Sequence, residues 1–316
     1  MNPLSAIFGA GVAVRNALYD HRIFHVKKLA RPVVSIGNIS VGGSGKTPFV
    51  IALGLLLAER DIAFDVLSRG YGRSSTEIAV VDPNGSPAQF GDEPLLIARK
   101  LQAPVIVGAD RYKAGLLAEQ KFSSKLHLLD DGFQHRRLHR DFDIVLLPAE
   151  DQAGSLLPTG RLREPITDLK RADVVVLFDS QTQPIEGKRV WHGARLIELP
   201  ATGGKIIAFS GIARPRQFLE GLKSSKSEIA GALTFRDHHR YQQNDVDRLL
   251  ALRKQTSADG FITTEKDLIN LGPLASQLSP LKTAGLRIEL ESAQQVVIEM
   301  IKSIEERSGQ QIQAPA

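Results

Sequence analysis

Short apolar runs alternate with longer stretches of helical periodicity along most of the chain. In the stretch 47–60, for example, Val50, Leu53 and Leu57 recur at the spacing of one helix face. The apolar runs between such stretches are too short for helices, which is typical of buried parallel strands. The predicted strands of the first part of the chain are residues 33–36, 64–68, 105–107, 126–130, 143–147 and 172–178. This alternation predicts an α/β fold with a doubly wound sheet.

A polar stretch that contains proline and glycine interrupts this alternation at residues 181–204, and a second alternation of predicted strands and helices begins at Lys205. The length of 316 residues also suggests two domains. We therefore expect an amphipathic N-terminal helical segment at 1–31, a core domain at 32–190 and a second, smaller α/β domain at 191–316. The linker is expected at about residues 181–204.

The stretch 35–48 has the layout of a phosphate-binding loop, with a strand, a glycine-rich turn and a helix that begins at Lys46. Glycines let backbone N–H groups converge on phosphate oxygens, and the helix N-terminus adds partial positive charge. Lys46 is expected to reach the β- and γ-phosphates and the Thr47 hydroxyl to bind Mg²⁺. Ser40 stands where the consensus has glycine. The residues expected to bind ATP are Ser40, Val41, Gly42, Gly43, Ser44, Gly45, Lys46 and Thr47.

A second informative stretch begins at the apolar run 126–129, which ends in Asp130 and Asp131. A carboxylate at a strand tip can reach the Mg²⁺ beside a phosphate loop, as in a Walker B element. Gln134 and His135 follow on the same loop and can face the same site. The sequence therefore predicts a P-loop nucleotide-binding domain.

Other polar groups follow predicted strands or begin predicted helices. Asp92 and Glu93 stand at a helix start, where carboxylates either cap backbone N–H groups or act in catalysis. Arg69 and Arg73 flank a glycine-containing loop after a strand, and Arg163 lies in a loop rich in phosphate-pairing groups. Solvated surface arginines are the alternative for the first two.

The second part of the chain places Asp237 beside His238 and His239. These residues favour a catalytic or capping role over a zinc site, because no third ligand has suitable spacing. A further strand–helix junction carries Thr-Thr-Glu-Lys-Asp at residues 263–267.

Composition excludes some functions. With 40 Lys+Arg against 35 Asp+Glu, the chain is too weakly basic to indicate nucleic-acid binding. The absence of cysteine excludes disulfides and thiolate chemistry, and no run of about 18 apolar residues predicts a membrane span. Residues 3–13 are apolar at helical spacing and are followed by basic residues up to Arg31. This segment either lies in a membrane interface or packs on the domain's own surface.

Together these patterns predict phosphoryl transfer, although they do not name the acceptor. Two alternatives remain open at this point. The chain could be a P-loop kinase of another sugar or metabolite, or a non-kinase P-loop ATPase switch that binds a partner.

Several motifs, which cover residues 30–270 in order, strongly resemble the tetraacyldisaccharide 4'-kinases of lipid A biosynthesis. That family also lacks the glycine that Ser40 replaces here. The motifs are residues 37–48, 68–72, 91–94, 110–112, 129–135, 162–165, 237–239 and 263–267.

The resemblance implies an enzyme that transfers the γ-phosphate of ATP to the 4'-hydroxyl of a tetraacyldisaccharide 1-phosphate. It implies Asp92 as the general base, with His238 as its partner, although His239 stays open as an alternative. Magnesium ligands implied by the resemblance are Thr47, Glu93, Asp130 and Asp131. Weaker candidates for substrate or phosphate contacts are Arg69, Arg73, Gln134, His135 and Arg163.

The implied substrate also bears on the N-terminal segment. Four acyl chains hold the disaccharide in the bilayer, at about 0.8 kcal/mol per buried methylene. We therefore expect residues 1–31 to bind the membrane surface, at the cytoplasmic face of the bacterial inner membrane. The protein is expected to be a peripheral monomer that binds no nucleic acid.

Overall fold

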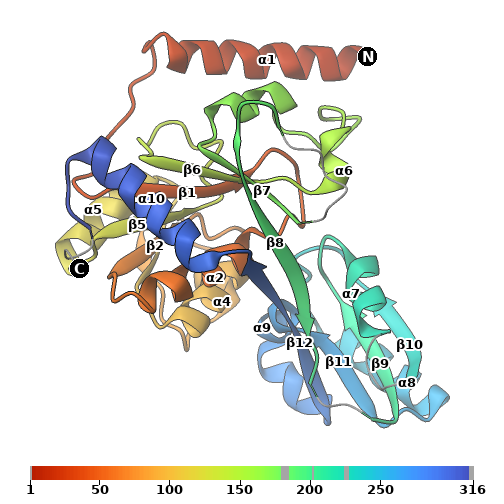
Figure 1. Cartoon of the computed structure of the whole chain (residues 1–316). Helices are drawn as coiled ribbons and strands as arrows, with labels where there is room; N and C mark the ends of the chain where they lie inside the picture. The colour runs from red at the N-terminus through yellow and green to blue at the C-terminus, as the bar shows by residue number, and fades with distance from the viewer. Residues whose placement is uncertain (1, 179–184, 201–202, 224–227, 313–316) are drawn as a thin grey trace.

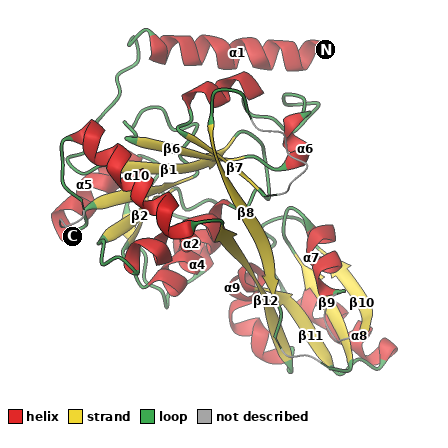
Figure 2. Ribbon diagram, in the orientation of Figure 1, coloured by secondary structure: helices red, strands yellow, loops and turns green. Residues whose placement is uncertain are grey.

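The computed structural model describes residues 2–178, 185–200, 203–223 and 228–312 of the chain. Its first half is a mostly parallel sheet with helices on both faces (Figures 1 and 2). The strands of this half are β1 (Val33–Asn38), β2 (Phe64–Ser68), β3 (Ala79–Val80), β4 (Val105–Val107), β5 (Leu126–Asp130), β6 (Phe142–Leu146) and β7 (Val174–Leu177). The helices are α1 (Pro3–Asp20), α2 (Lys46–Ala58), α3 (Pro87–Phe90), α4 (Asp92–Leu101), α5 (Arg111–Lys121), α6 (Ala149–Gln152) and the 3₁₀ helix η1 (Ile166–Arg171).

The second half repeats the strand–helix alternation on a smaller scale. Its strands are β8 (Arg189–Glu198), β9 (Lys205–Ser210), β10 (Glu228–Thr234), β11 (Gly260–Thr264) and β12 (Leu281–Leu290). Its helices are α7 (Pro215–Leu222), α8 (Gln243–Thr256), α9 (Glu265–Leu271), the 3₁₀ helix η2 (Gly272–Gln277) and α10 (Ala293–Ser308). Across the described residues the strands form one sheet in the order β10-β9-β11-β12-β8-β7-β6-β1-β5-β2-β4-β3.

Successive residues of β1 point to opposite faces of the sheet, and both faces are apolar. Val34 belongs to a core with Phe49 of α2, whereas Val33 belongs to a core with Ala114 of α5. Burial on both faces explains why the strand reads as a continuous apolar run. The predicted doubly wound α/β class is confirmed.

The segment predicted as a linker, residues 181–204, contains a ten-residue strand. Its residues 181–184 and 201–202 lie outside the described residues. β8 pairs with β7 in parallel through 189–192 and with β12 in antiparallel fashion through 193–198. β8 and β12 thus form a β8–β12 ribbon that joins the two halves (Figure 1). Most side chains of β8 are only partly covered, so its sequence lacks the apolar run of a buried strand.

The final helix returns to the first half, although the predicted second domain, residues 191–316, includes it. Val297 and Met300 of α10 are buried in the same core as α2. Arg307 Nη1 donates to the Asp141 carbonyl oxygen at 3.0 Å and lies 2.8 Å from Asp173 Oδ1. The smaller α/β unit therefore lies between β8 and β12 in the chain.

Helix α1 turns its polar residues toward the protein and its apolar residues outward. Ser5 Oγ donates to the Leu156 carbonyl oxygen at 2.9 Å, and Asn16 Nδ2 donates to Asp168 at 2.7 Å. On the opposite side the exposed apolar residues are Leu4, Ile7 and Val14. No helix among the described residues is long and apolar enough to cross a membrane.

Candidate active site

The glycine-rich turn after β1 forms the predicted loop and leads directly into α2. Gly45, the residue before α2, has a φ of 89°, a left-handed conformation that glycine adopts without strain. Ser40 is buried, and its hydroxyl donates to the Asp151 carboxylate. A serine therefore has a bonding partner at the position where the consensus has glycine.

Lys46 and Thr47 begin α2, as predicted. Lys46 Nζ lies 3.3 Å from Asn38 Oδ1 and 3.4 Å from Asp131 Oδ1, and Thr47 is buried. The Lys46 ammonium therefore stands between the loop and the acidic tip of β5, which is where a phosphate chain would need it.

Three arginines around the loop were not among the predicted site residues, although Arg161 belongs to the same phosphate-pairing stretch as Arg163. The Val41 N–H donates to the Arg161 carbonyl oxygen at 2.8 Å, and Arg195 Nη2 donates to the Ser44 carbonyl oxygen at 2.6 Å. Arg214, from the second half, packs so closely on Gly43 that a Cβ there would lie 2.8 Å from its Cγ. The loop is thus held by backbone and side-chain groups from distant segments.

Asp130 ends β5 and Asp131 follows it, and the two carboxylates lie in different environments. Asp130 Oδ2 accepts from the Ser68 hydroxyl at 2.9 Å, while its buried Oδ1 has no hydrogen-bond partner among the described residues. Burial, together with the nearby Glu93 and Asp131 carboxylates, raises the pKa of Asp130 to about 7. Burial opposes ionisation of Asp131 too, but Lys46 and Arg163 outweigh it and lower the pKa of that group.

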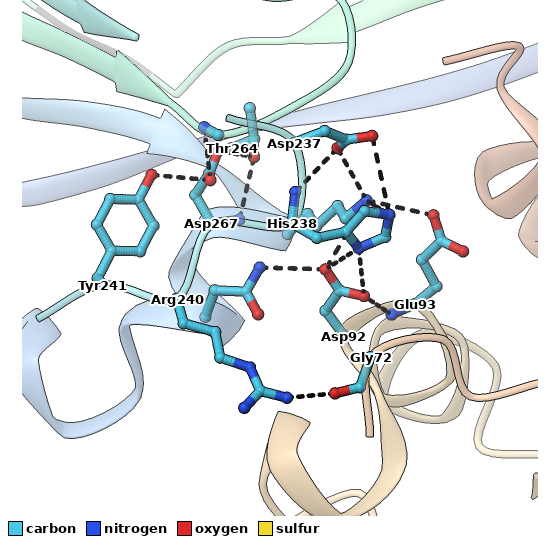
Figure 3. A network of polar contacts seen from close by, with 12 residues as sticks. Gly72, Asp92, Glu93, Asp237, His238, Arg240, Tyr241, Thr264 and Asp267 are labelled. Carbon is cyan, nitrogen blue, oxygen red and sulfur yellow. Dashed lines mark hydrogen bonds and ion pairs between the residues drawn. The ribbon is translucent and has the colours of Figure 1, made fainter. Parts of the chain in front are cut away.

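Asp92 is the first residue of α4, and only 4% of its surface is exposed. His238 approaches it from the second half, with Nδ1 at 2.9 Å from Asp92 Oδ2 (Figure 3). His239 instead contacts Asp245 at 2.8 Å, so the neighbour of Asp92 is His238. Burial would raise the pKa of Asp92, but His238 and Lys266 outweigh it and lower the pKa to about 2.

Four of the five predicted substrate contacts line one cavity of about 290 Å³. Arg73 does not line it. Burial and the nearby Arg111 guanidinium lower the pKa of His135 to about 4, which leaves that imidazole neutral at pH 7. Sequence reasoning missed Arg111 as a site residue, although its motif at 110–112 was noticed. The cavity is lined by Arg69, Ala109, Arg111, Asp131, Gln134, His135 and Arg163.

The predicted carboxylate ligands Glu93, Asp130 and Asp131 are near one another but form no closed site. Among the described residues, no three His, Cys, Asp or Glu side chains gather as a metal centre. Glu93 is close enough to raise the pKa of Asp130, and Asp131 contacts Lys46. An incomplete protein ligand set suits Mg²⁺, which is usually bound by one or two carboxylates together with substrate phosphates.

The fold and the loop around Lys46 define a P-loop nucleotide-binding protein of the α/β class. A model of the tetraacyldisaccharide-1-P 4'-kinase family matches residues 1–305. The chain belongs to this family.

Two named relatives and one solved structure are similar to this chain over nearly its whole length. The chain is 51% identical to the tetraacyldisaccharide 4'-kinase of Koribacter versatilis, covering 98% of this chain and 100% of that protein. It is 39% identical to the enzyme of the same name from Geobacter metallireducens, covering 91% and 92%. The crystal structure of "apo" form LpxK from Aquifex aeolicus in complex with ATP matches with a TM-score of 0.78 and 34% identity, over 96% of this chain and 98% of that one.

Proposed function

We propose that this protein transfers the γ-phosphate of ATP to the 4'-hydroxyl of a tetraacyldisaccharide 1-phosphate in lipid A biosynthesis. The observation that carries the proposal is the Asp92–His238 pair in a member of this kinase family, with the adjacent Glu93 close to Asp130. An ATPase switch needs a nucleotide site but no carboxylate–imidazole pair of this kind.

The acceptor hydroxyl and the phosphate chain of ATP each need a different kind of group. Asp92 accepts the proton of the acceptor hydroxyl while the hydroxyl oxygen bonds to the γ-phosphorus of ATP. The bond between the γ-phosphorus and the oxygen that bridges to the β-phosphate breaks, which releases ADP. His238 holds the carboxylate through Nδ1. Lys46 neutralises negative charge on the phosphate chain.

Magnesium suits the acidic tip of β5. Asp130 Oδ1 is buried without a partner among the described residues, so a cation there would satisfy it. Thr47, Glu93 and Asp131 are the further groups able to hold the ion, directly or through water. When bound, Mg²⁺ supplies positive charge to the phosphate oxygens during transfer.

The acceptor's anionic headgroup suits the cavity lined by Arg69, Arg111 and Arg163, because guanidinium groups pair well with phosphate. This cavity borders α1, since Arg15 donates to the Gln134 carbonyl oxygen. A lipid held against α1 would then present its headgroup to a cavity whose Asp131 also contacts Lys46.

The outward face of α1 is suited to a membrane surface at the cytoplasmic side of the inner membrane. Ile7, Val14 and Leu4 are 70%, 61% and 59% exposed, which is unusual for apolar side chains arranged on one helix face. The basic residues Lys27 and Lys28 follow on an exposed segment and would attract anionic headgroups.

The kinase is tested with γ-labelled ATP and a tetraacyldisaccharide 1-phosphate in detergent micelles. We expect label in the lipid for the wild type and none for Asp92→Ala. Hydrolysis of ATP without transfer to lipid would contradict the proposal and favour an ATPase switch. Equal transfer to a soluble sugar would favour a kinase of another substrate.

Membrane binding is tested by flotation with vesicles that contain anionic phospholipid. The double variant Ile7→Glu, Val14→Glu should lose most of its bound fraction, because charges would be forced into the interface. Ile298→Glu is the matched control, since Ile298 is an exposed apolar residue on α10. Equal flotation of both variants would contradict the proposal that the outward face of α1 binds the membrane.

A further inference from the structure

Helix α9 presents two polar side chains, one helical turn apart, to the Asp92 carboxylate. Asn270 Nδ2 donates to Asp92 Oδ2 at 3.1 Å, and Lys266 Nζ lies 3.8 Å from the same oxygen. Residues four apart share one helix face, so both act from the same side. Neither residue was expected in the site from the sequence.

The start of α9 is itself firmly held. The Asp267 N–H donates to Thr264 Oγ1 at 3.1 Å, which caps the helix. The buried Asp267 carboxylate accepts from the Tyr241 hydroxyl at 2.9 Å and from the Gly211 N–H at 2.8 Å (Figure 3). Lys266 therefore projects from a fixed point of the second half.

Lys266 is surrounded by the charged groups of the site. Its Nζ lies 3.3 Å from Glu93 Oε1, 3.3 Å from His238 Nε2 and 3.6 Å from Asp237 Oδ1. Its side chain is only 16% exposed, so these contacts are poorly screened by water. One ammonium group thus touches both halves of the molecule.

These contacts make the two oxygens of Asp92 unequal. Oδ2 accepts from His238 and Asn270 and lies beside Lys266, whereas Oδ1 accepts from the Glu93 N–H at 2.9 Å and lies 3.2 Å from His238 Nδ1. The carboxylate cannot rotate without losing several donors at once.

We propose that Lys266 and Asn270 are positioning residues that fix Asp92 with Oδ1 directed to the acceptor hydroxyl. This inference rests on the proposed function, because it assumes that Asp92 takes the hydroxyl proton. Lys266 also contacts His238 Nε2, so it holds the imidazole with Nδ1 toward Asp92. α9 thereby belongs to the active site through its contacts with Asp92 and His238.

The test compares Lys266→Met with Lys100→Met in steady-state transfer from ATP to the lipid. Lys100 Nζ pairs with Glu265 Oε1 at 2.5 Å, so this control also removes an ion pair between α4 and α9 without touching Asp92. For Lys266→Met we expect kcat to fall by about 10- to 100-fold with the KM for ATP within about twofold of wild type. Lys100→Met should stay within about twofold in kcat.

A double-mutant cycle separates positioning from structural support. If Lys266 acts through Asp92, adding Lys266→Met to Asp92→Asn should lower kcat by less than about twofold further. An equal loss in both backgrounds, or a change confined to the KM for ATP, would overturn the inference. Asn270→Ala is the second variant and should lower kcat by about fivefold, with the same dependence on Asp92.

Failure of this inference differs from failure of the proposed function. A wild-type enzyme that labels the lipid, alongside Lys266→Met and Asn270→Ala enzymes of unchanged kcat, would overturn only the positioning role. A wild-type enzyme that transfers no phosphate to the lipid would overturn both. Thermal unfolding of each variant shows whether it is folded. If Lys266→Met is not folded, the kcat of Asn270→Ala tests the positioning role in its place.

Discussion

The two ends of the candidate site are assembled in different ways. At the nucleotide end, Lys46 and Asp131 lie 3.4 Å apart, and both come from the first half of the chain. At the acceptor end, Asp92 comes from α4, whereas His238 comes from the loop before α8 in the second half, 2.9 Å away. The Lys46–Asp131 contact therefore forms within the first half, whereas the Asp92–His238 contact depends on how the two halves are placed.

This difference explains what could be read from the sequence. The phosphate loop is local, because glycines, Lys46 and Thr47 follow one strand, so a short motif predicts it. The choice between His238 and His239 is not local. Adjacent residues point in different directions, and only the fold shows which one reaches Asp92.

We expect the largest effect from Asp92→Ala, which removes the proposed base at the acceptor end. kcat should fall by about 10²–10⁴-fold, the usual contribution of a general base. ATP binding, measured by calorimetry, should be unchanged because Asp92 is not part of the loop. Wild-type turnover by this variant would remove the proposed distinction between the two ends.

Lys46→Ala tests the nucleotide end and should lower kcat/KM by about 10²–10³-fold, because the phosphate chain loses its fixed cation. Unlike Asp92→Ala, this variant should also bind ATP more weakly. If calorimetry gave the wild-type affinity for ATP in both variants, the assignment of nucleotide binding to Lys46 would be wrong.

The sheet beneath the nucleotide end predicts a pH-dependent stability. His127 of β5 is buried between Asp65 of β2, at 2.7 Å, and Glu119 of α5, at 3.4 Å. Burial would lower the pKa of His127, but the two carboxylates outweigh it and raise the pKa to about 9. Because the folded pKa lies above the unfolded one, this stabilisation is complete below about pH 6.5 and is lost as pH rises through about 9.

The shift corresponds to about 3 kcal/mol of unfolding free energy between these limits. Urea unfolding of the wild type and of His127→Gln at pH 6 and pH 9 measures it. The wild type should lose more stability than the variant. Equal losses would mean that the His127 imidazolium does not support β5.

A smaller catalytic effect than those of Asp92→Ala and Lys46→Ala distinguishes the two histidines. His238→Ala should lower kcat by about tenfold, because Asp92 loses one of its donors while keeping Asn270 and Lys266. His239→Ala should stay within about twofold, since its partner is Asp245. The reverse order would contradict the assignment of the pair.

Much of the fold was predictable because the buried strands are apolar on both faces. β8 was not, since most of its side chains are partly exposed and its polar composition resembles a linker. The return of α10 to the first half also escaped prediction, because periodicity identifies a helix face but not the surface that covers it. Lys266 was missed for a related reason, as its contacts come from α4 and from the loop at Asp237.

The β8–β12 ribbon has a consequence for the modular construction of this enzyme. The chain leaves the first half along β8, returns along β12 and then completes the first core with α10. The smaller unit is therefore an insertion whose entry and exit strands are hydrogen-bonded neighbours, at Gly193 and Leu290. A short hairpin turn grafted between these two positions would excise the unit and leave Val297 and Met300 in the first core, but it would remove Ile269 and Ile288 from that core. The resulting miniature should keep the Lys46–Asp131 contact but lose Arg195 and Arg214 from the phosphate loop, together with the half of the molecule that engages Asp92.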